Sequence, residues 1–146
     1  MHLINYIRKD TNMIKWTVNY TNYNGEDVTE DLYFHLNKAE LTTMQFEANG
    51  AFGQYLERLV NERDIKRLGQ EFRKIILNSY GKKSDDGRLF RKSKEMREEF
   101  EQSEAYSTLF MELLGDEDKA TKFIKGILPA DLQNTESPNR LPKLAE

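Results

Sequence analysis

The fold is decided by residues 14–36, which read IKWTVNYTNYNGEDVTEDLYFHL. Over Ile14–Thr21 the apolar residues fall on every second position, as in a strand with one buried face. Asn24-Gly25 then supplies the residues that a type I′ turn prefers, because both central residues of that turn need φ > 0. The alternation resumes over Val28–Leu36, with one misfit at Glu30. The stretch therefore predicts a two-stranded antiparallel β-hairpin.

The hairpin needs a cover, because two strands alone are only marginally stable in water. Asn37 followed by Glu40 has the capping-box spacing of a helix that continues to Asn49-Gly50. A short helix is predicted over residues 52–61 from its apolar spacing. These helices follow the hairpin directly and are candidates to cover its apolar face.

Further helices are predicted towards the C-terminus. Asp64 begins a long one that Gly81 ends, and its inner stripe is Ile65, Leu68, Phe72, Ile75, Ile76 and Tyr80. Residues 82–92 are predicted as a loop. Three more helices begin after Ser93, Ser103 and Asp116. The expected fold class is α+β, an N-terminal two-stranded antiparallel β-hairpin followed by about five or six short helices.

Composition limits the function. The 146 residues are the length of one domain, and their formal net charge of −3 is unlike the basic surface of a dedicated DNA-binding protein. The absence of cysteine excludes disulfides, zinc–thiolate sites and thiol catalysis. The sequence contains no run of 18 apolar residues, so no membrane span is predicted. The N-terminus lacks the pattern of a signal peptide. We expect an N-terminal extension over residues 1–12, a single α+β domain over 13–129 and a flexible tail over 130–146.

Catalytic, cofactor and metal sites are not predicted. The two histidines, His2 and His35, do not form a ligand pair, and His35 is interpreted as a surface side chain on the polar face of its strand. The loop at Ser84–Gly87 lacks the first carboxylate and the final glutamate of a calcium-binding loop. Gly81–Ser84 lacks the residue order of a phosphate loop. We therefore expect no cofactor, and a protein that is not an enzyme.

Charge is distributed unevenly between two neighbouring segments. Five basic residues outweigh two aspartates over Gly81–Ser93, and five glutamates outweigh two basic residues over Ser93–Glu104. A surface pattern without function is one interpretation, and self-association of the basic loop with the acidic helix of another copy is the alternative. The candidate self-association residues are Lys82, Lys83, Arg88, Arg91, Lys92, Glu98, Glu99 and Glu101.

Four segments together resemble one protein family. YFHLNKAELT (33–42) is similar to a junction F-x-L-x-K-A-E-L, and ILNSYGKKSDDGRLFRKS (76–93) is similar to a loop Y-G-x-K-S-x-D-G-x-x-F-x-K-S. QSEAYSTLFMEL (102–113) resembles a helix T-E-A-Y-S-x-L-F-M-E-L, and residues 120–130 resemble its closing F-x-x-G-I-I-P. The family is the tail assembly chaperones of long-tailed bacteriophages that infect Gram-positive bacteria. The resemblance begins near Met13, so residues 1–12 precede the usual start.

The resemblance implies a chaperone in the host cytoplasm. Its members coat the tape measure protein, keep it soluble and recruit the major tail protein. Many are also made as a longer, frameshifted form whose extension meets the tail-tube subunit. A homo-oligomer is implied, and neither nucleic acid nor a membrane is an expected partner. On this interpretation, residues 130–146 are where a linker to the extension would begin.

A helical client requires an apolar groove, and methionine and aromatic side chains suit adaptable contacts. The candidate partner-binding residues are Met44, Phe46, Phe52, Tyr55, Met96 and Met111. The alternative that these side chains fill the core remains open. Two alternative functions also remain, a structural tail or connector component of the virion and a small regulator that binds nucleic acid through the basic loop.

Overall fold

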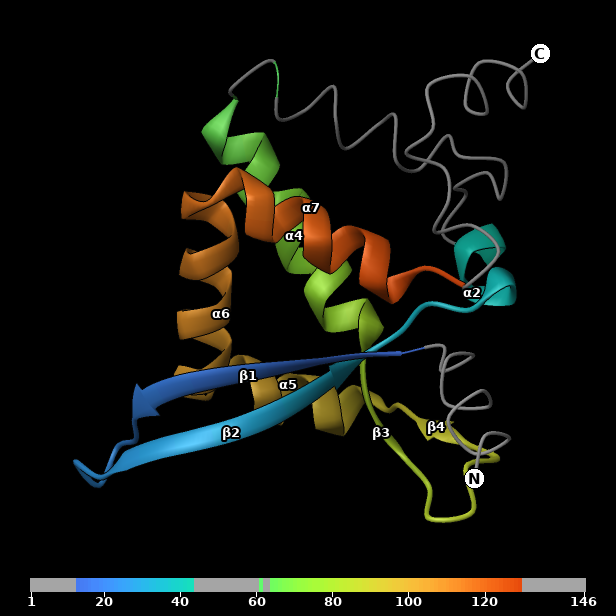
Figure 1. Ribbon diagram of the computed structural model, residues 1–146, viewed down its shortest axis with the longest axis horizontal. Helices are drawn as coiled ribbons and strands as arrows, with labels where there is room; N and C mark the ends of the chain where they lie inside the picture. The colour runs from blue at the N-terminus through green and yellow to red at the C-terminus, as the bar shows by residue number, and fades with distance from the viewer. Residues whose placement is uncertain (1–12, 44–60, 62–63, 130–146) are drawn as a thin grey trace, which may run out of the picture.

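The computed structural model describes residues 13–43, 61 and 64–129. The chain begins with a hairpin of two strands, β1 (Ile14–Thr21) and β2 (Asp27–Phe34), as predicted (Figure 1). The strands pair in antiparallel register from Ile14 opposite Phe34 to Thr21 opposite Asp27. Their shared inner face is buried at Trp16, Val18, Leu32 and Phe34. The misfit on that face, Glu30, accepts a hydrogen bond of 2.6 Å from the Tyr20 hydroxyl.

The turn of the hairpin differs from the predicted type I′ turn. Asn22 still bonds to Glu26 across the ladder, which leaves a three-residue loop over residues 23–25. The Asn22 side chain accepts from the backbone N–H of Asn24 and of Glu26, both at 2.9 Å. Gly25 has a φ of 80°, which glycine adopts without a steric penalty. The asparagine side chain therefore organises a longer loop than the Asn24-Gly25 pair alone suggests.

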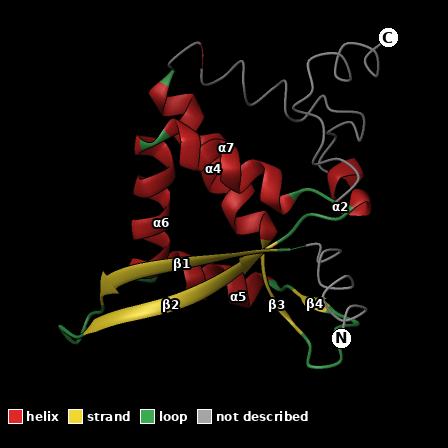
Figure 2. Ribbon diagram, viewed as in Figure 1, coloured by secondary structure: helices red, strands yellow, loops and turns green. Residues whose placement is uncertain are grey.

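The sheet has four strands, where the sequence predicted two. The segment predicted as a loop contains β3 (Tyr80–Lys83) and β4 (Phe90–Arg91), and the sheet order is β1-β2-β3-β4 (Figure 2). All three pairings are antiparallel. Gly81 was predicted to end the long helix, but α4 ends at Ser79 and Gly81 lies inside β3. A Cβ at Gly81 would lie 2.6 Å from Phe90 Cε2. Strands of four and two residues are too short to show an alternating pattern.

Five helices lie in the described part of the chain, and their number agrees with the expected five or six. They are α2 (Lys38–Thr43), α4 (Ile65–Ser79), α5 (Lys94–Glu101), α6 (Glu104–Gly115) and α7 (Glu117–Ile127). The predicted caps are confirmed, because the side chains of four residues accept from the first turn of their helices: Asp64, Ser93, Ser103 and Asp116. The predicted helix over 52–61, the predicted end of the first helix near Asn49, and the two terminal segments lie outside the described residues, apart from Asn61.

The predicted stripe of α4 is buried along most of its length. Leu68, Phe72, Ile75 and Ile76 belong to the core, whereas Ile65 is 61% exposed at the start of the helix. The prediction is wrong at Ile65, because the first turn of α4 extends past the packed part of the helix.

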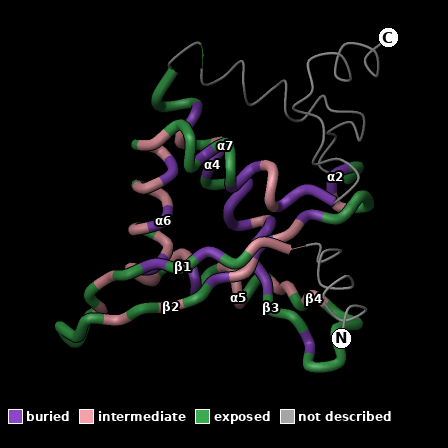
Figure 3. The backbone as a smooth tube through the Cα atoms, viewed as in Figure 1, coloured by how far each residue is buried: buried purple, intermediate pink, exposed green. Residues whose placement is uncertain are grey.

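The core is centred on Phe34 at the end of β2. Its ring centroid lies 5.0 Å from that of Phe123 on α7 and 6.0 Å from that of Phe100 on α5. Tyr80 stacks on Phe100 with centroids 4.2 Å apart. Figure 3 shows buried positions along α4, α6 and α7, and residues of all three helices belong to the core. Strands and helices therefore share a single hydrophobic core.

Candidate functional site

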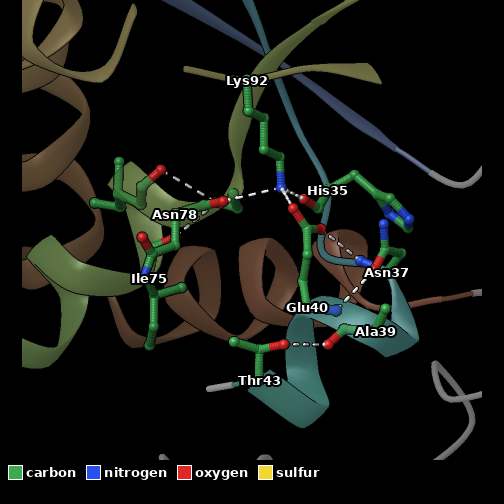
Figure 4. Close-up of polar contacts among 10 residues, drawn as sticks. His35, Asn37, Ala39, Glu40, Thr43, Ile75, Asn78 and Lys92 are labelled. Carbon is green, nitrogen blue, oxygen red and sulfur yellow. Dashed lines mark hydrogen bonds and ion pairs between the residues drawn. The ribbon is translucent and has the colours of Figure 1, made fainter. Parts of the chain in front are cut away.

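A lysine joins three elements at the end of the hairpin. The Lys92 ammonium donates to the backbone carbonyl of His35 at 2.7 Å and to that of Asn78 at 2.9 Å. It also forms an ion pair of 2.7 Å with the Glu40 carboxylate. Figure 4 shows the ammonium between Asn78 and Glu40, with Asn37 beyond the carboxylate. We call these four residues, His35, Glu40, Asn78 and Lys92, the Lys92 junction.

The junction uses a capping box to orient its acid. Glu40 Oε1 accepts from the Asn37 N–H at 2.9 Å, and Asn37 Oδ1 accepts from the Glu40 N–H at 2.8 Å. The other oxygen of Glu40 is the one that meets Lys92. Burial lowers the pKa of the Lys92 ammonium, and its hydrogen bond to Glu40 opposes that shift. The predicted cap of α2 is thus confirmed, and it also carries the ion pair.

His35 differs from the predicted surface histidine. It follows the end of β2, its ring packs edge-on against Phe90 with centroids 6.2 Å apart, and its Nδ1 is buried without a hydrogen-bond partner. Burial lowers the pKa of the imidazole, and the charge of Lys92 lowers it further. The ring is therefore neutral at neutral pH. The alternation of the strand suggested that the ring is exposed, but Phe90 of β4 packs against it.

The chemistry of the junction is structural. Every acceptor of Lys92 is a carbonyl or a paired carboxylate, so the ammonium fixes the start of α2 and the end of α4 relative to β4. Within the ranges 13–43 and 64–129, no cluster of histidines and carboxylates has the composition of a metal site. Among the helices of the same ranges, none has both the length and the apolarity of a membrane span.

The candidate self-association residues divide into two groups. Lys82, Lys83, Arg88 and Arg91 are exposed on and between β3 and β4, whereas the charge of Lys92 is directed into the junction. On α5, Glu98 and Glu99 are exposed, while Glu101 bonds to Arg73 at 2.7 Å. The structure therefore removes Lys92 from the candidate surface and leaves Glu101 already paired.

The candidate partner-binding residues are also separated. Met96 is half-buried and packs against the core, in agreement with the core alternative. Met111 on α6 is 61% exposed. Four further candidates lie outside the described residues: Met44, Phe46, Phe52 and Tyr55.

Comparison with known proteins identifies the family. A family model described as phage tail assembly chaperone matches residues 13–144, which is most of the chain. The chain belongs to this family. No curated protein and no solved structure matches it.

The fold brings together two of the segments that carried the resemblance. Glu40 lies in the segment that resembles K-A-E-L, and Lys92 lies in the segment that resembles F-x-K-S. These residues are 52 positions apart and form the ion pair of the junction. The sequence did not predict their contact, and the only available signal was that each charged residue lies inside a motif.

Proposed function

We propose that this tail assembly chaperone binds the tape measure protein of its phage and recruits the major tail protein to it. Membership of the family supports a role in tail assembly. The exposure of Met111 carries the proposal of a client surface, because a large apolar side chain at 61% exposure suits contact with another protein. The site carries no catalytic role in this proposal.

The surface around Met111 has the character of a helix-binding site. Phe110 and Leu114 are half-buried beside it, and Leu109 and Leu113 anchor the opposite side of α6 in the core. α4 crosses α6 here, because a Cβ on Gly69 would lie 3.5 Å from the Phe110 ring.

Ile65 on α4, one turn before Gly69, is a second exposed apolar side chain. A long helical client would place one apolar stripe against this region.

The remaining candidates extend the proposal. Met44, Phe46, Phe52 and Tyr55 are proposed to contribute further client contacts. The exposed basic residues around β3 and β4 are proposed to meet Glu98 and Glu99 of a second copy, which would build a homo-oligomer by a head-to-tail contact.

A frameshifted longer form is proposed to carry the contact with the major tail protein. The place of action is proposed to be the host cytoplasm. A Gram-positive host is proposed from the motif resemblance alone.

Mass spectrometry of infected cells and of purified virions tests whether the chain assists assembly or forms part of the particle. We expect its peptides in infected cells before lysis and their absence from virions, because an assembly chaperone leaves the finished tail. Detection in virions at the abundance of a tail protein would contradict the proposal and favour a structural tail or connector component.

A further inference from the structure

The second strand of the hairpin has one edge that is only partly paired. β2 pairs with β1 along all eight of its residues, but β3 pairs with it only at Tyr33 and Phe34. Figure 2 shows β2 and β3 leaving their common end in different directions. A cleft of about 460 Å³ lies between them, lined by Glu30–Tyr33 on one side and Tyr80–Lys83 on the other.

The backbone groups along this edge can be assigned by alternation. The His35 N–H donates to the Ser79 carbonyl at 2.8 Å, on the β3 side of the sheet. The N–H and C=O groups of successive residues in a strand point to opposite sides of it. Asp27, Thr29 and Asp31 are an even number of residues from His35, so their N–H and C=O groups also point away from β1. Within the described ranges, no strand lies beside these three residues. We call them the open edge.

The two faces of the open edge differ in chemistry. On the outer face, Asp31 accepts from the Thr17 hydroxyl at 2.6 Å and Asp27 accepts from the Thr21 hydroxyl at 3.1 Å. On the face that turns towards the helices, Val28 is half-buried and Leu32 is 2% exposed, and Glu30 between them accepts from the Tyr20 hydroxyl at 2.6 Å. A strand that paired here would therefore meet the aspartates on one face and, on the other, two apolar side chains on either side of a carboxylate that is already hydrogen-bonded.

The carboxylates near the open edge have no cationic partner. Over the described parts of the chain, no ion pair involves Glu26, Asp27, Glu30 or Asp31. Pairing of this edge with the same edge of a second copy would bring the aspartates together, and like charges opposite one another are destabilising. Charge complementarity therefore favours a positively charged occupant.

We propose that the open edge of β2 binds an extended segment of another protein by strand addition, and that basic and apolar residues alternate in that segment. Backbone groups of Asp27, Thr29 and Asp31 pair with the segment, its basic side chains lie beside Asp27 and Asp31, and its apolar side chains lie beside Val28 and Leu32. This surface is separate from the client surface around Met111 and takes an extended partner rather than a helical one.

The competing explanation is that the acidic side chains merely protect an exposed strand edge from aggregation. The two explanations differ in whether backbone pairing occurs. The order of basic and apolar residues in the bound segment matters for strand addition. It does not matter for simple charge attraction, which depends only on the composition of the segment.

Two peptides of equal composition separate these explanations. The full chain is titrated with the capped peptide Lys-Val-Lys-Val-Lys-Val and with the scrambled peptide Lys-Lys-Lys-Val-Val-Val, by calorimetry and by amide hydrogen exchange. We expect the alternating peptide to bind about tenfold more tightly, since only it places both faces and its backbone in register. Exchange should slow at the amides of Asp27, Thr29 and Asp31. Equal affinity for both peptides, with unchanged exchange, would overturn the proposal.

Two variants of the protein test the backbone contacts and the charge contacts separately. Thr29→Pro removes an N–H of the open edge but none that bonds to β1, and it should weaken the alternating peptide about tenfold. Asp31→Asn should weaken it less and reduce its salt dependence. If Thr29→Pro does not fold, N-methylation of alternate peptide residues removes the same hydrogen bonds from the partner. Undiminished binding of the N-methylated peptide would contradict strand addition.

Discussion

At the residue scale, Lys92 shows how one buried cation can fix several segments. Its three acceptors lie 57, 52 and 14 positions away in the sequence. The Lys92 side chain is 12% exposed and that of Glu40 is 33% exposed, so water replaces few of these contacts. Removing the ammonium leaves a carboxylate and two carbonyls without their donor.

Replacement of Lys92 by methionine keeps the length of the side chain and removes its charge. We expect Lys92→Met to lower the free energy of unfolding by about 2 kcal/mol, because partly buried acceptors lose a charged donor. Lys94→Met is the matched control, since the Lys94 side chain is 82% exposed and 4.0 Å from Glu98. Urea unfolding at pH 7 should show a change of at most about 0.5 kcal/mol for this control. Equal effects of the two changes would contradict the structural role of Lys92.

The lowered pKa of His35 predicts a dependence of stability on pH. The unfolded state binds the proton near the ordinary histidine pKa of 6.5, whereas the folded state binds it only at lower pH. Stability from this residue is therefore complete above pH 6.5 and is lost as the pH falls below that value. The charges that face the imidazole are those of Lys92 and Glu40.

The comparison of wild type with His35→Gln isolates this dependence. We expect wild type to lose more stability than the variant between pH 7.5 and pH 5.5 in urea unfolding. If the free energy of unfolding changed with pH in the same way for both proteins, His35 would titrate alike in the folded and unfolded states. That result would contradict the prediction. The acidic residues titrate in both proteins and therefore cancel in the comparison.

At the element scale, periodicity explains what the sequence could predict. β1 and β2 have eight residues each, enough for alternation to be visible, and the caps of α4, α5, α6 and α7 stand directly before their helices. β3 follows α4 with no turn between them, and β4 has two residues. Their pairing depends on tertiary contact with β2, which no local pattern reports. The Lys92 junction was missed for the same reason.

Gly81 tests the pairing of the two short strands. We expect Gly81→Ala to lower the free energy of unfolding by about 1–3 kcal/mol, because its Cβ would lie 2.7 Å from the Arg91 carbonyl oxygen. Gly115→Ala is the control, because no atom lies within 4 Å of a Cβ at that position. Thermal unfolding of both variants measures the difference. A neutral Gly81→Ala would contradict the close approach of β3 and β4.

At the scale of the whole molecule, exposed charge of opposite sign lies on two elements. The segment with Lys82 and Lys83 is basic, and α5 with Glu98 and Glu99 is acidic. Basic and acidic side chains are both exposed, so the contact proposed above can pair two copies of the chain. Such a contact weakens with salt, because exposed charges are screened.

Charge exchange between two variants tests this contact. We expect the wild type to form larger species in sedimentation at low salt, and both Lys82→Glu/Lys83→Glu and Glu98→Lys/Glu99→Lys to be monomeric because each repels its own copies. An equimolar mixture of the two variants should again form larger species, because every surface of one variant is then opposite in charge to the surface of the other that it meets. A monomeric wild type would contradict self-association through these residues.

The most direct test of the account is the solubility of the tape measure protein when it is co-expressed with this chain. We predict a soluble complex with wild type, a marked loss with Met111→Glu, and no loss with Thr121→Glu, which adds the same charge at an exposed position on α7. Burying a charge against an apolar client stripe costs binding free energy, whereas Thr121 is not part of the proposed apolar contact on α6. A tape measure protein that remains insoluble with wild type, or is equally soluble without it, would contradict the proposed function.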